Sequence, residues 1–402
     1  MTATALSIAK PASRGEVQRA ADPLAKARAL GPLIAAAADT VEQTRRIPEP
    51  LLTELHASGL LRMLLPLSCG GGQHAPATYF RAIEEVARHD ASVAWNMFVA
   101  NSATLIAPFL DLEVARTIYA SGRTLIAWGP PNTCQARAVE GGYRVSGRWD
   151  FASGCRQATW MGVHANVVEP DGQLRLNRFG RPTIRTLLFP ATQATLLDTW
   201  HTIGLKGTAS DSYTTDDLFV PDAYSSTRED PTLRREPGPL YAFTMQGLYA
   251  VGVAGVALGA ARAMQEAFIA LAAKKAPRGQ ARLADQSAVQ GDVARNAAKL
   301  DSAGAYLDAT LGSIYAAADD HEIICVTDRG RVRLACAHSI QAALEVADAI
   351  YKSAGVDAIF PGSPFERRFR DIHTLSQQIQ SRSSHFEAVG QIILGNGTDA
   401  FL

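Results

Sequence analysis

The hydrophobic positions in the first third of the chain recur at the spacing of a helix. Apolar side chains lie three and four residues apart at Tyr79, Phe80, Ile83, Val86 and Ala87. This spacing puts them on one buried helical face. Three consecutive glycines end the segment 66–72 (PLSCGGG), which predicts a loop because glycine adopts backbone shapes closed to other residues. The pattern predicts an α-helical domain over residues 21–123, preceded by a flexible tail at 1–20.

Between residues 124 and 220 the pattern changes to short runs of β-branched and aromatic residues separated by turn residues. Strands are predicted at residues 124–128, 143–149, 160–168, 183–189 and 213–220. Gly141 and Gly142 form a tight turn before the second of them. The pattern predicts a small antiparallel β domain over residues 124–235, which ends in a linker rich in proline and charge.

Beyond the linker the sequence is helical and rich in alanine. Helices are predicted at residues 241–275, 282–318, 331–354 and 365–394, and four long helices joined by short loops indicate a bundle over 236–402. The apolar stretch 241–264 contains Gln246 and Arg262 and favours a buried bundle helix over a membrane span, which needs about 20 strongly apolar residues. The fold class is therefore mainly α with a β domain.

Composition and charge exclude several classes of partner. The 402 residues include 39 Lys plus Arg and 39 Asp plus Glu, so no electrostatic footprint for nucleic acid or an anionic membrane exists. Five cysteines without a CxxC pair indicate reduced thiols. The N-terminal segment lacks the apolar core of a signal peptide, so we expect a cytoplasmic protein.

Nucleotide and metal motifs are missing from the sequence as well. It has no Walker loop and no GxGxxG motif after a predicted strand. Gly252, Gly255 and Gly259 are closely spaced, but they fall inside a helical alanine run. His373 and His385 are twelve residues apart, which is too far for a metal pair on one helix. We therefore predict no nicotinamide site and no metal site.

Three segments resemble the acyl-CoA dehydrogenase superfamily, whose layout is also an α domain, a β domain and a four-helix bundle. Residues 142–160 (GYRVSGRWDFASGCRQATW) resemble its flavin-contacting strand pair, and WDFASG is similar to the form in its two-component flavin hydroxylases. Residues 200–211 (WHTIGLKGTASD) are similar to its Gly-x-(Arg/Lys)-Gly strand at the flavin. Residues 365–373 (FERRFRDIH) resemble the Arg-Asp segment that opens its last bundle helix. The resemblance covers nearly the whole chain after residue 20.

The main alternative is an acyl-CoA dehydrogenase that oxidises an acyl thioester. Such enzymes commonly place a catalytic Glu about nine residues after that Arg, whereas residues 376–381 here read SQQIQS. A carboxamide cannot act as a general base, which argues against dehydrogenation. Some dehydrogenases take the base from another helix, so this alternative stays open, and a non-enzymatic helical scaffold is a more distant one.

The resemblance implies the oxygenase component of a two-component flavin-dependent monooxygenase. Such a protein takes reduced FAD, or FMN, from a separate flavin reductase and reacts it with O2 to a flavin C4a-hydroperoxide, which oxygenates a small aromatic substrate. The protein supplies a dry pocket and a few polar groups. A homotetramer is also implied.

By the same resemblance, Ser153 is the hydroxyl near flavin N5, unless it merely ends a strand before a turn. Trp160 falls near the flavin ring or is a core tryptophan of the β domain. Thr208 and Ser210 contact the flavin or are ordinary strand hydroxyls. Residues that would reach the cofactor of a neighbouring subunit, or simply lie on a solvated helix, are Arg278, Arg282 and Gln290.

Related phenol hydroxylases place a histidine, a serine and a second histidine at the substrate. Rough alignment puts Asn101, Trp128 and Gln378 at these positions, so the base that activates a phenol is missing. We therefore expect a substrate that is nucleophilic when neutral, with indole as the first candidate. His373 faces the flavin or is a hydrogen-bonded bundle histidine. Together with Ser153 and Gln378 it completes the predicted catalytic set.

Overall fold

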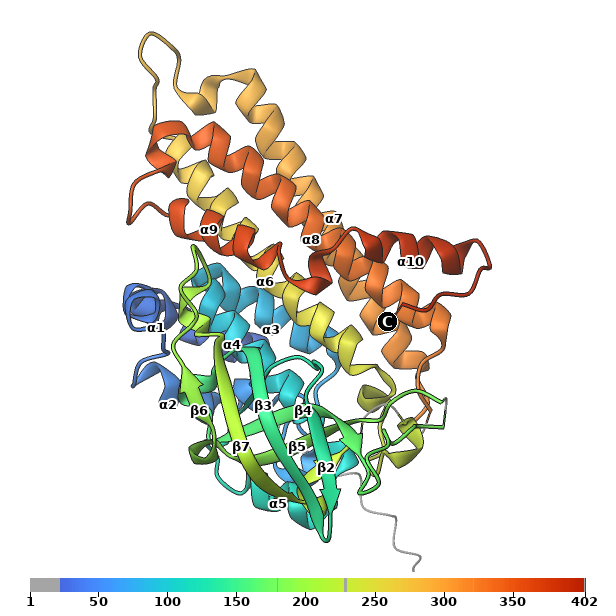
Figure 1. Cartoon of the computed structure of the whole chain (residues 1–402). Coiled ribbons are helices and arrows are strands. Elements are labelled where there is room, and N and C mark those ends of the chain that lie inside the picture. Colours follow the sequence, from blue (N-terminus) through green and yellow to red (C-terminus); the bar gives the residue numbers. More distant parts are fainter. Residues whose placement is uncertain (1–21, 179, 228–229, 321, 401) are drawn as a thin grey trace, which may run out of the picture.

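The computed structural model describes residues 22–178, 180–227, 230–320, 322–400 and 402; the predicted tail lies outside them. Long C-terminal helices form one end of the molecule and the sheet forms the other (Figure 1). Of the N-terminal helices, α3 and α4 lie between the sheet and these long helices, whereas α5 lies at the sheet end. Where these parts meet, the ends of several elements come together.

The N-terminal part of the described chain is helical. Its α-helices are α1 (Pro23–Thr44), α2 (Leu51–Ser58), α3 (Pro76–His89), α4 (Ala91–Thr104) and α5 (Leu112–Tyr119). The apolar face predicted for α3 is buried, which confirms that prediction. At the start of α4, the side chain of Asp90 accepts a hydrogen bond from the N–H of Val93 at 2.8 Å. Every residue of α4 except Val99 is buried, so α4 runs through the core.

The predicted strands are all present in the sheet, which gains three further short ones. Its strands are β1 (Ile126–Trp128), β2 (Gln135–Val139), β3 (Gly142–Ala152), β4 (Trp160–Val168), β5 (Ile184–Pro190), β6 (Thr195–Leu197), β7 (Asp211–Pro221) and β8 (Ser225–Ser226). They follow the order β6-β7-β3-β2-β4-β5-β8, and β1 pairs with β4. The sheet is mixed, because β4 pairs in parallel with β1 and β2. The prediction of an antiparallel β domain was wrong for these two pairings: β2 was not predicted, and the chain passes through β3 between β2 and β4.

The long helices α6 (Met245–Ala272), α7 (Ser287–Ala317) and α8 (Val326–Ala354) form the bundle. Glycines bring α6 close to the N-terminal helices. A Cβ added at Gly252 would lie 2.6 Å from the Phe98 ring, and one at Gly259 would lie 2.2 Å from the Glu84 carbonyl oxygen. By length and composition α6 could cross a membrane, but 89% of its most apolar window is buried inside the protein, as expected for a bundle helix.

The predicted fourth long helix is broken in two. α9 (Glu366–Leu375) and α10 (Ser384–Ile393) flank an irregular segment. Gln378 has an extended backbone (φ −73°, ψ 147°), and its side chain accepts a hydrogen bond from the N–H of Gln380 at 2.6 Å. The Ser381 hydroxyl donates to the Leu375 carbonyl at 3.0 Å. Such side-chain to backbone bonds compete with helix formation, which explains why the prediction of one continuous helix was wrong.

Candidate functional site

Ser153 follows β3, just after an irregularity in its pairing. The register of β3 against β7 shifts between Trp149 and Ala152, and Phe151 lies inside this bulge with φ 64°. A bulge redirects side chains, and positive φ is unusual for an aromatic residue. The side chain of Phe151 is 62% exposed. Ser153, two residues further on, is half-buried, so the end of β3 carries an exposed aromatic ring and a partly exposed hydroxyl close together in sequence.

Behind Ser153 lies a chain of hydroxyl groups from the segment before β7. The oxygen atoms of Ser153 and Ser210 are 2.6 Å apart, and those of Ser210 and Thr208 are 2.8 Å apart. The Thr208 hydroxyl donates to the Leu205 carbonyl at 2.9 Å. On the other side, the Trp95 indole N–H donates to the Ser153 oxygen at 3.0 Å. Thr208 and Ser210 were predicted to contact a flavin, but they are 1% and 5% exposed and support Ser153 from behind.

A strained turn holds this hydroxyl chain in place. Leu205 and Ala209 have φ of 48° and 38°, in the left-handed region that non-glycine residues seldom adopt. The N–H of Leu205 donates to the Asp371 carboxyl group on α9 at 2.6 Å. Gly204 packs so tightly on α9 that an added Cβ would lie 2.2 Å from the Arg370 carbonyl oxygen. The Arg-Asp segment of α9 therefore clamps the turn that carries Thr208 and Ser210.

Two buried carboxyl groups meet at this clamp. Burial raises the pKa of Asp371 to about 7, and the nearby Asp90 at the start of α4 adds to this effect. Burial likewise raises the pKa of Asp90 to about 6. Both groups cost free energy when they ionise, since charge is poorly solvated there.

An aromatic row extends from Ser153 towards α6. The ring centroids of Trp95 and Phe98 on α4 are 4.7 Å apart, and those of Phe98 and Tyr249 are 4.9 Å apart, both edge to face. Tyr249 is half-buried, and burial raises the pKa of its phenol, so this group stays neutral at ordinary pH. Trp95 and Phe98 are 6% and 0% exposed, so the row is closely packed apolar core that begins at the Ser153 hydroxyl.

Two of the residues predicted for substrate, Asn101 and Gln378, are hydrogen-bonded to nearby backbone. Asn101 is fully buried and donates to the carbonyls of Leu60 at 2.7 Å and Met97 at 2.8 Å. Its side-chain oxygen accepts from the N–H of Leu64 at 3.2 Å. Every polar atom of Asn101 is thus bound to backbone, which favours a structural role over the predicted substrate contact. Gln378 lies in the helix break, where its oxygen is bound to backbone.

Trp128 and Trp160 lie on neighbouring strands beneath α4. Trp128 is half-buried and meets the His164 ring edge-on at 5.1 Å. Trp160 is half-buried and stacks on Tyr224 with centroids 5.7 Å apart, and it packs against the same apolar cluster as Trp128. Its packing favours the alternative of a core tryptophan over the predicted contact with the flavin ring.

His373 points towards α8. Its Nε2 atom lies 2.9 Å from a carboxylate oxygen of Asp348, and its ring packs on Phe369. This arrangement favours the alternative of a hydrogen-bonded bundle histidine.

The predicted phosphate contacts are exposed at the far end of the bundle. Arg282 pairs with Asp285 at 2.8 Å, and the Gln290 amide donates to the Ala284 carbonyl at 2.9 Å. Arg278 is exposed in the same loop between α6 and α7. These residues do not meet Ser153 within one chain, so a role at the cofactor requires a second copy.

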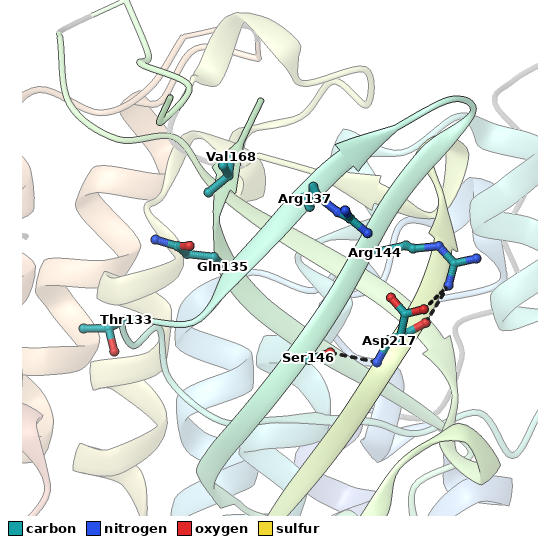
Figure 2. Close-up of a pocket in the computed structure, with 7 residues that line it drawn as sticks. All are labelled: Thr133, Gln135, Arg137, Arg144, Ser146, Val168 and Asp217. Atoms are coloured by element: carbon teal, nitrogen blue, oxygen red, sulfur yellow. Dashed lines mark hydrogen bonds and ion pairs between the residues drawn. The ribbon is translucent and has the colours of Figure 1, made fainter. Parts of the chain in front are cut away.

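Among the described residues, hollows also lie outside the Ser153 hydroxyl chain. Figure 2 shows one of about 490 Å³ over β2, β3 and β7, where Arg144 pairs with Asp217 at 2.6 Å. It includes none of the predicted site residues. The other, about 920 Å³, lies between α1, the segment 200–206 and α9. Trp200 lines this larger hollow, and its ring meets the Phe151 ring edge-on at 6.4 Å. Through Trp200 the hollow extends to the exposed Phe151 ring.

Sequence reasoning missed four residues of this region. Phe151, Trp95, Tyr249 and Asp371 lie on four different elements and carry no spacing signal that joins them. Phe151 and Asp371 fall within the segments quoted for the resemblance, so attention to every aromatic and carboxylate there could have found these two. The aromatic row on α4 and α6 becomes visible only in three dimensions.

Comparison with known proteins gives a consistent result. Residues 25–112 match the model of the acyl-CoA dehydrogenase N-terminal domain, and residues 251–382 match that of the C-terminal domain. The oxygenase component of FADH2-dependent resorcinol hydroxylase from Rhizobium sp. is 28% identical over 90% of each chain. Indole-3-acetate monooxygenase from Pseudomonas putida is 28% identical over 92% of this chain and 95% of its own.

A solved structure agrees in fold. XiaF from Streptomyces sp., in complex with FADH2 and glycerol, superposes with a TM-score of 0.86 at 22% identity, covering 95% of this chain and 97% of that one. The predicted fold class is confirmed. The chain belongs to the acyl-CoA dehydrogenase family, and the curated relatives that it resembles over most of its length are flavin-dependent oxygenases.

Proposed function

We propose that this protein is the oxygenase component of a two-component system that uses reduced flavin and O2 to oxygenate a small aromatic or heteroaromatic molecule. One observation carries the proposal. The half-buried Ser153 hydroxyl lies at the end of a buried hydrogen-bond chain and accepts from the Trp95 indole, and the exposed Phe151 ring stands two residues before it in the sequence. An aromatic face next to a fixed polar group suits a flat ring with polar edges.

Reduced FAD is the proposed cofactor. Phe151 would lie against its ring and Ser153 would meet its N5 edge. When bound, reduced flavin would supply the chemistry that activates O2. The chain's own contribution is to hold N5 and exclude water, and the closely packed row of Trp95, Phe98 and Tyr249 suits that second task.

The proposed substrate is a ring that reacts while neutral, with indole first. The residues aligned with the activating groups of phenol hydroxylases, Asn101, Trp128 and Gln378, include no titratable side chain. Asn101 has no polar atom left for a ligand. A base is therefore not available from these positions, and an electron-rich heteroaromatic ring needs none.

We also propose a homotetramer in the cytosol, served by a separate flavin reductase. Arg278, Arg282 and Gln290 are exposed on one loop and the start of one helix, so they could reach the cofactor of a neighbouring copy. Analytical ultracentrifugation of the wild type and of Arg278→Ala checks assembly, and flavin binding by both checks this contact. A monomeric wild type that binds flavin at full affinity would contradict it.

The function is tested by supplying reduced FAD, O2 and a panel of indoles, phenols and thioethers, with products identified by mass spectrometry. The expected result is an oxygenated indole. An acyl-CoA dehydrogenase would instead bleach bound oxidised flavin when given an acyl-CoA under anaerobic conditions, and that result would overturn the proposal. Failure to bind any flavin would favour the scaffold alternative.

A further inference from the structure

Counting protons along the Ser153 hydroxyl chain fixes the direction of each hydrogen bond. A hydroxyl group has one proton to donate and two lone pairs to accept, an indole N–H only donates, and a carbonyl only accepts. The Thr208 hydroxyl gives its proton to the Leu205 carbonyl. The 2.8 Å contact between Thr208 and Ser210 must then be a bond that Ser210 donates.

The same count continues to Ser153. Because the proton of Ser210 is used towards Thr208, the 2.6 Å contact between Ser210 and Ser153 must be donated by Ser153. The indole of Trp95 donates to the Ser153 oxygen and occupies one of its lone pairs. Ser153 is left with one lone pair and no proton for a ligand. With Thr208 and Ser210 only 1% and 5% exposed, solvent does not reorient the chain.

We propose that the buried chain Ser153–Ser210–Thr208–Leu205 makes Ser153 a hydrogen-bond acceptor and thereby selects reduced over oxidised flavin. This inference rests on the proposed function. N5 of reduced flavin carries a hydrogen and is a donor, whereas N5 of oxidised flavin is an acceptor. Only the reduced form complements Ser153 as the chain presents it. Thr208 and Ser210 are thus positioning residues that set the redox preference without touching the flavin.

Reversing the chain costs the bond from Thr208 to the Leu205 carbonyl. The loss of one such bond corresponds to about three- to tenfold tighter binding of reduced flavin than of oxidised flavin. Leu205 is itself held by Asp371 through its N–H, so the terminal acceptor of the chain is fixed. The polarity is therefore set by groups remote from the ligand.

The test measures dissociation constants of the intact protein for FAD in air and for FADH2 under anaerobic conditions, repeated with FMN and FMNH2. The wild type should bind the reduced form more tightly. Thr208→Val removes the donor to the Leu205 carbonyl, and Ser210→Ala removes the acceptor of the Ser153 proton. Either change frees the Ser153 proton for oxidised N5. The Kd for oxidised flavin divided by the Kd for reduced flavin should therefore fall by about three- to tenfold. The midpoint potential of the bound flavin should shift by about 15 to 30 mV towards negative values.

Two variants separate polarity from loss of structure. Thr208→Ser keeps the donor and should keep the wild-type ratio, and Trp95→Phe should change both constants without changing their ratio. The inference is overturned, and the proposed function is not, if this ratio is unchanged in both Thr208→Val and Ser210→Ala. Both variants must be folded, as judged by circular dichroism, and must bind FADH2. A wild type that prefers oxidised flavin also overturns it. A wild type that binds neither form overturns the proposed function, and the inference with it.

Discussion

The carboxyl group of Asp371 on α9 accepts a hydrogen bond at 2.6 Å from the backbone N–H of Leu205, whose own carbonyl ends the Ser153 hydroxyl chain. The N–H and the carbonyl group of Leu205 thus connect α9 to the Ser153 hydroxyl just after β3. Asp371 is 4% exposed, so this link is closed to solvent.

The raised pKa of Asp371 predicts a pH-dependent stability. Its folded-state pKa of about 7 exceeds the unfolded value of about 3.9. The contribution of the neutral carboxyl group to the free energy of unfolding is therefore fully present below pH about 4 and is lost as the pH rises to 7. Asp371→Asn, which cannot ionise, should gain on the wild type by about 2 °C or more in Tm between pH 4 and 7. Thermal unfolding followed by circular dichroism checks this. Parallel Tm profiles for the two proteins would contradict it.

Ser153→Ala should uncouple flavin oxidation from product formation. Without the hydroxyl the N5 edge is unprotected, so a larger share of the O2 consumed should appear as hydrogen peroxide. The measurement is peroxide and oxygenated indole formed per O2 consumed. Ser146→Ala is the matched control on β3. The Ser146 hydroxyl accepts from the Asp217 N–H at the hollow over β2, β3 and β7. Equal coupling in both variants would count against the assignment.

Trp128→Ala should weaken the binding of an aromatic substrate more than that of flavin. Removing a half-buried indole takes away flat apolar surface, and we expect about tenfold weaker binding of indole. Trp160→Ala is the control, because Trp160 is a second half-buried tryptophan on the neighbouring strand β4, where it stacks on Tyr224. Equilibrium titrations with indole and with FADH2 separate the two effects. If Trp128→Ala weakens both equally, Trp128 is not at the substrate.

Gly259→Ala should destabilise the protein by about 1–3 kcal/mol, because the new Cβ would lie 2.2 Å from the Glu84 carbonyl oxygen and push α6 away from α3. Gly312 in α7 has nothing within 4 Å of an added Cβ, so Gly312→Ala should instead gain about 0.5–1 kcal/mol. Urea unfolding measures both. A loss at both positions would mean that helix propensity does not govern Gly312.

Local periodicity predicted the elements that are long and regular. The α3 face and the five main strands follow from spacing within single segments. The strands β2, β6 and β8 are two to five residues long and too short for an alternating signal. The break after α9 depends on bonds made by Gln378 and Ser381, which a helical pattern does not reveal.

Ser153 was predicted from its motif, but its surroundings could not be. The Ser153 hydroxyl chain joins the end of β3 to a turn 57 residues later, and Trp95 approaches from a helix 58 residues earlier. Asn101 shows the opposite failure: alignment placed it at the substrate, whereas the fold uses it to tie α4 to the segment 60–64. Contacts between distant segments decide both cases.

The most direct test of the central claim is oxygen insertion from O2. The purified protein is mixed with reduced FAD and indole under ¹⁸O2, and the product is analysed by mass spectrometry. Incorporation of one ¹⁸O atom into the indole product, reduced in Ser153→Ala, is the predicted result. Product without the label, or no product while an acyl-CoA is desaturated, would contradict it.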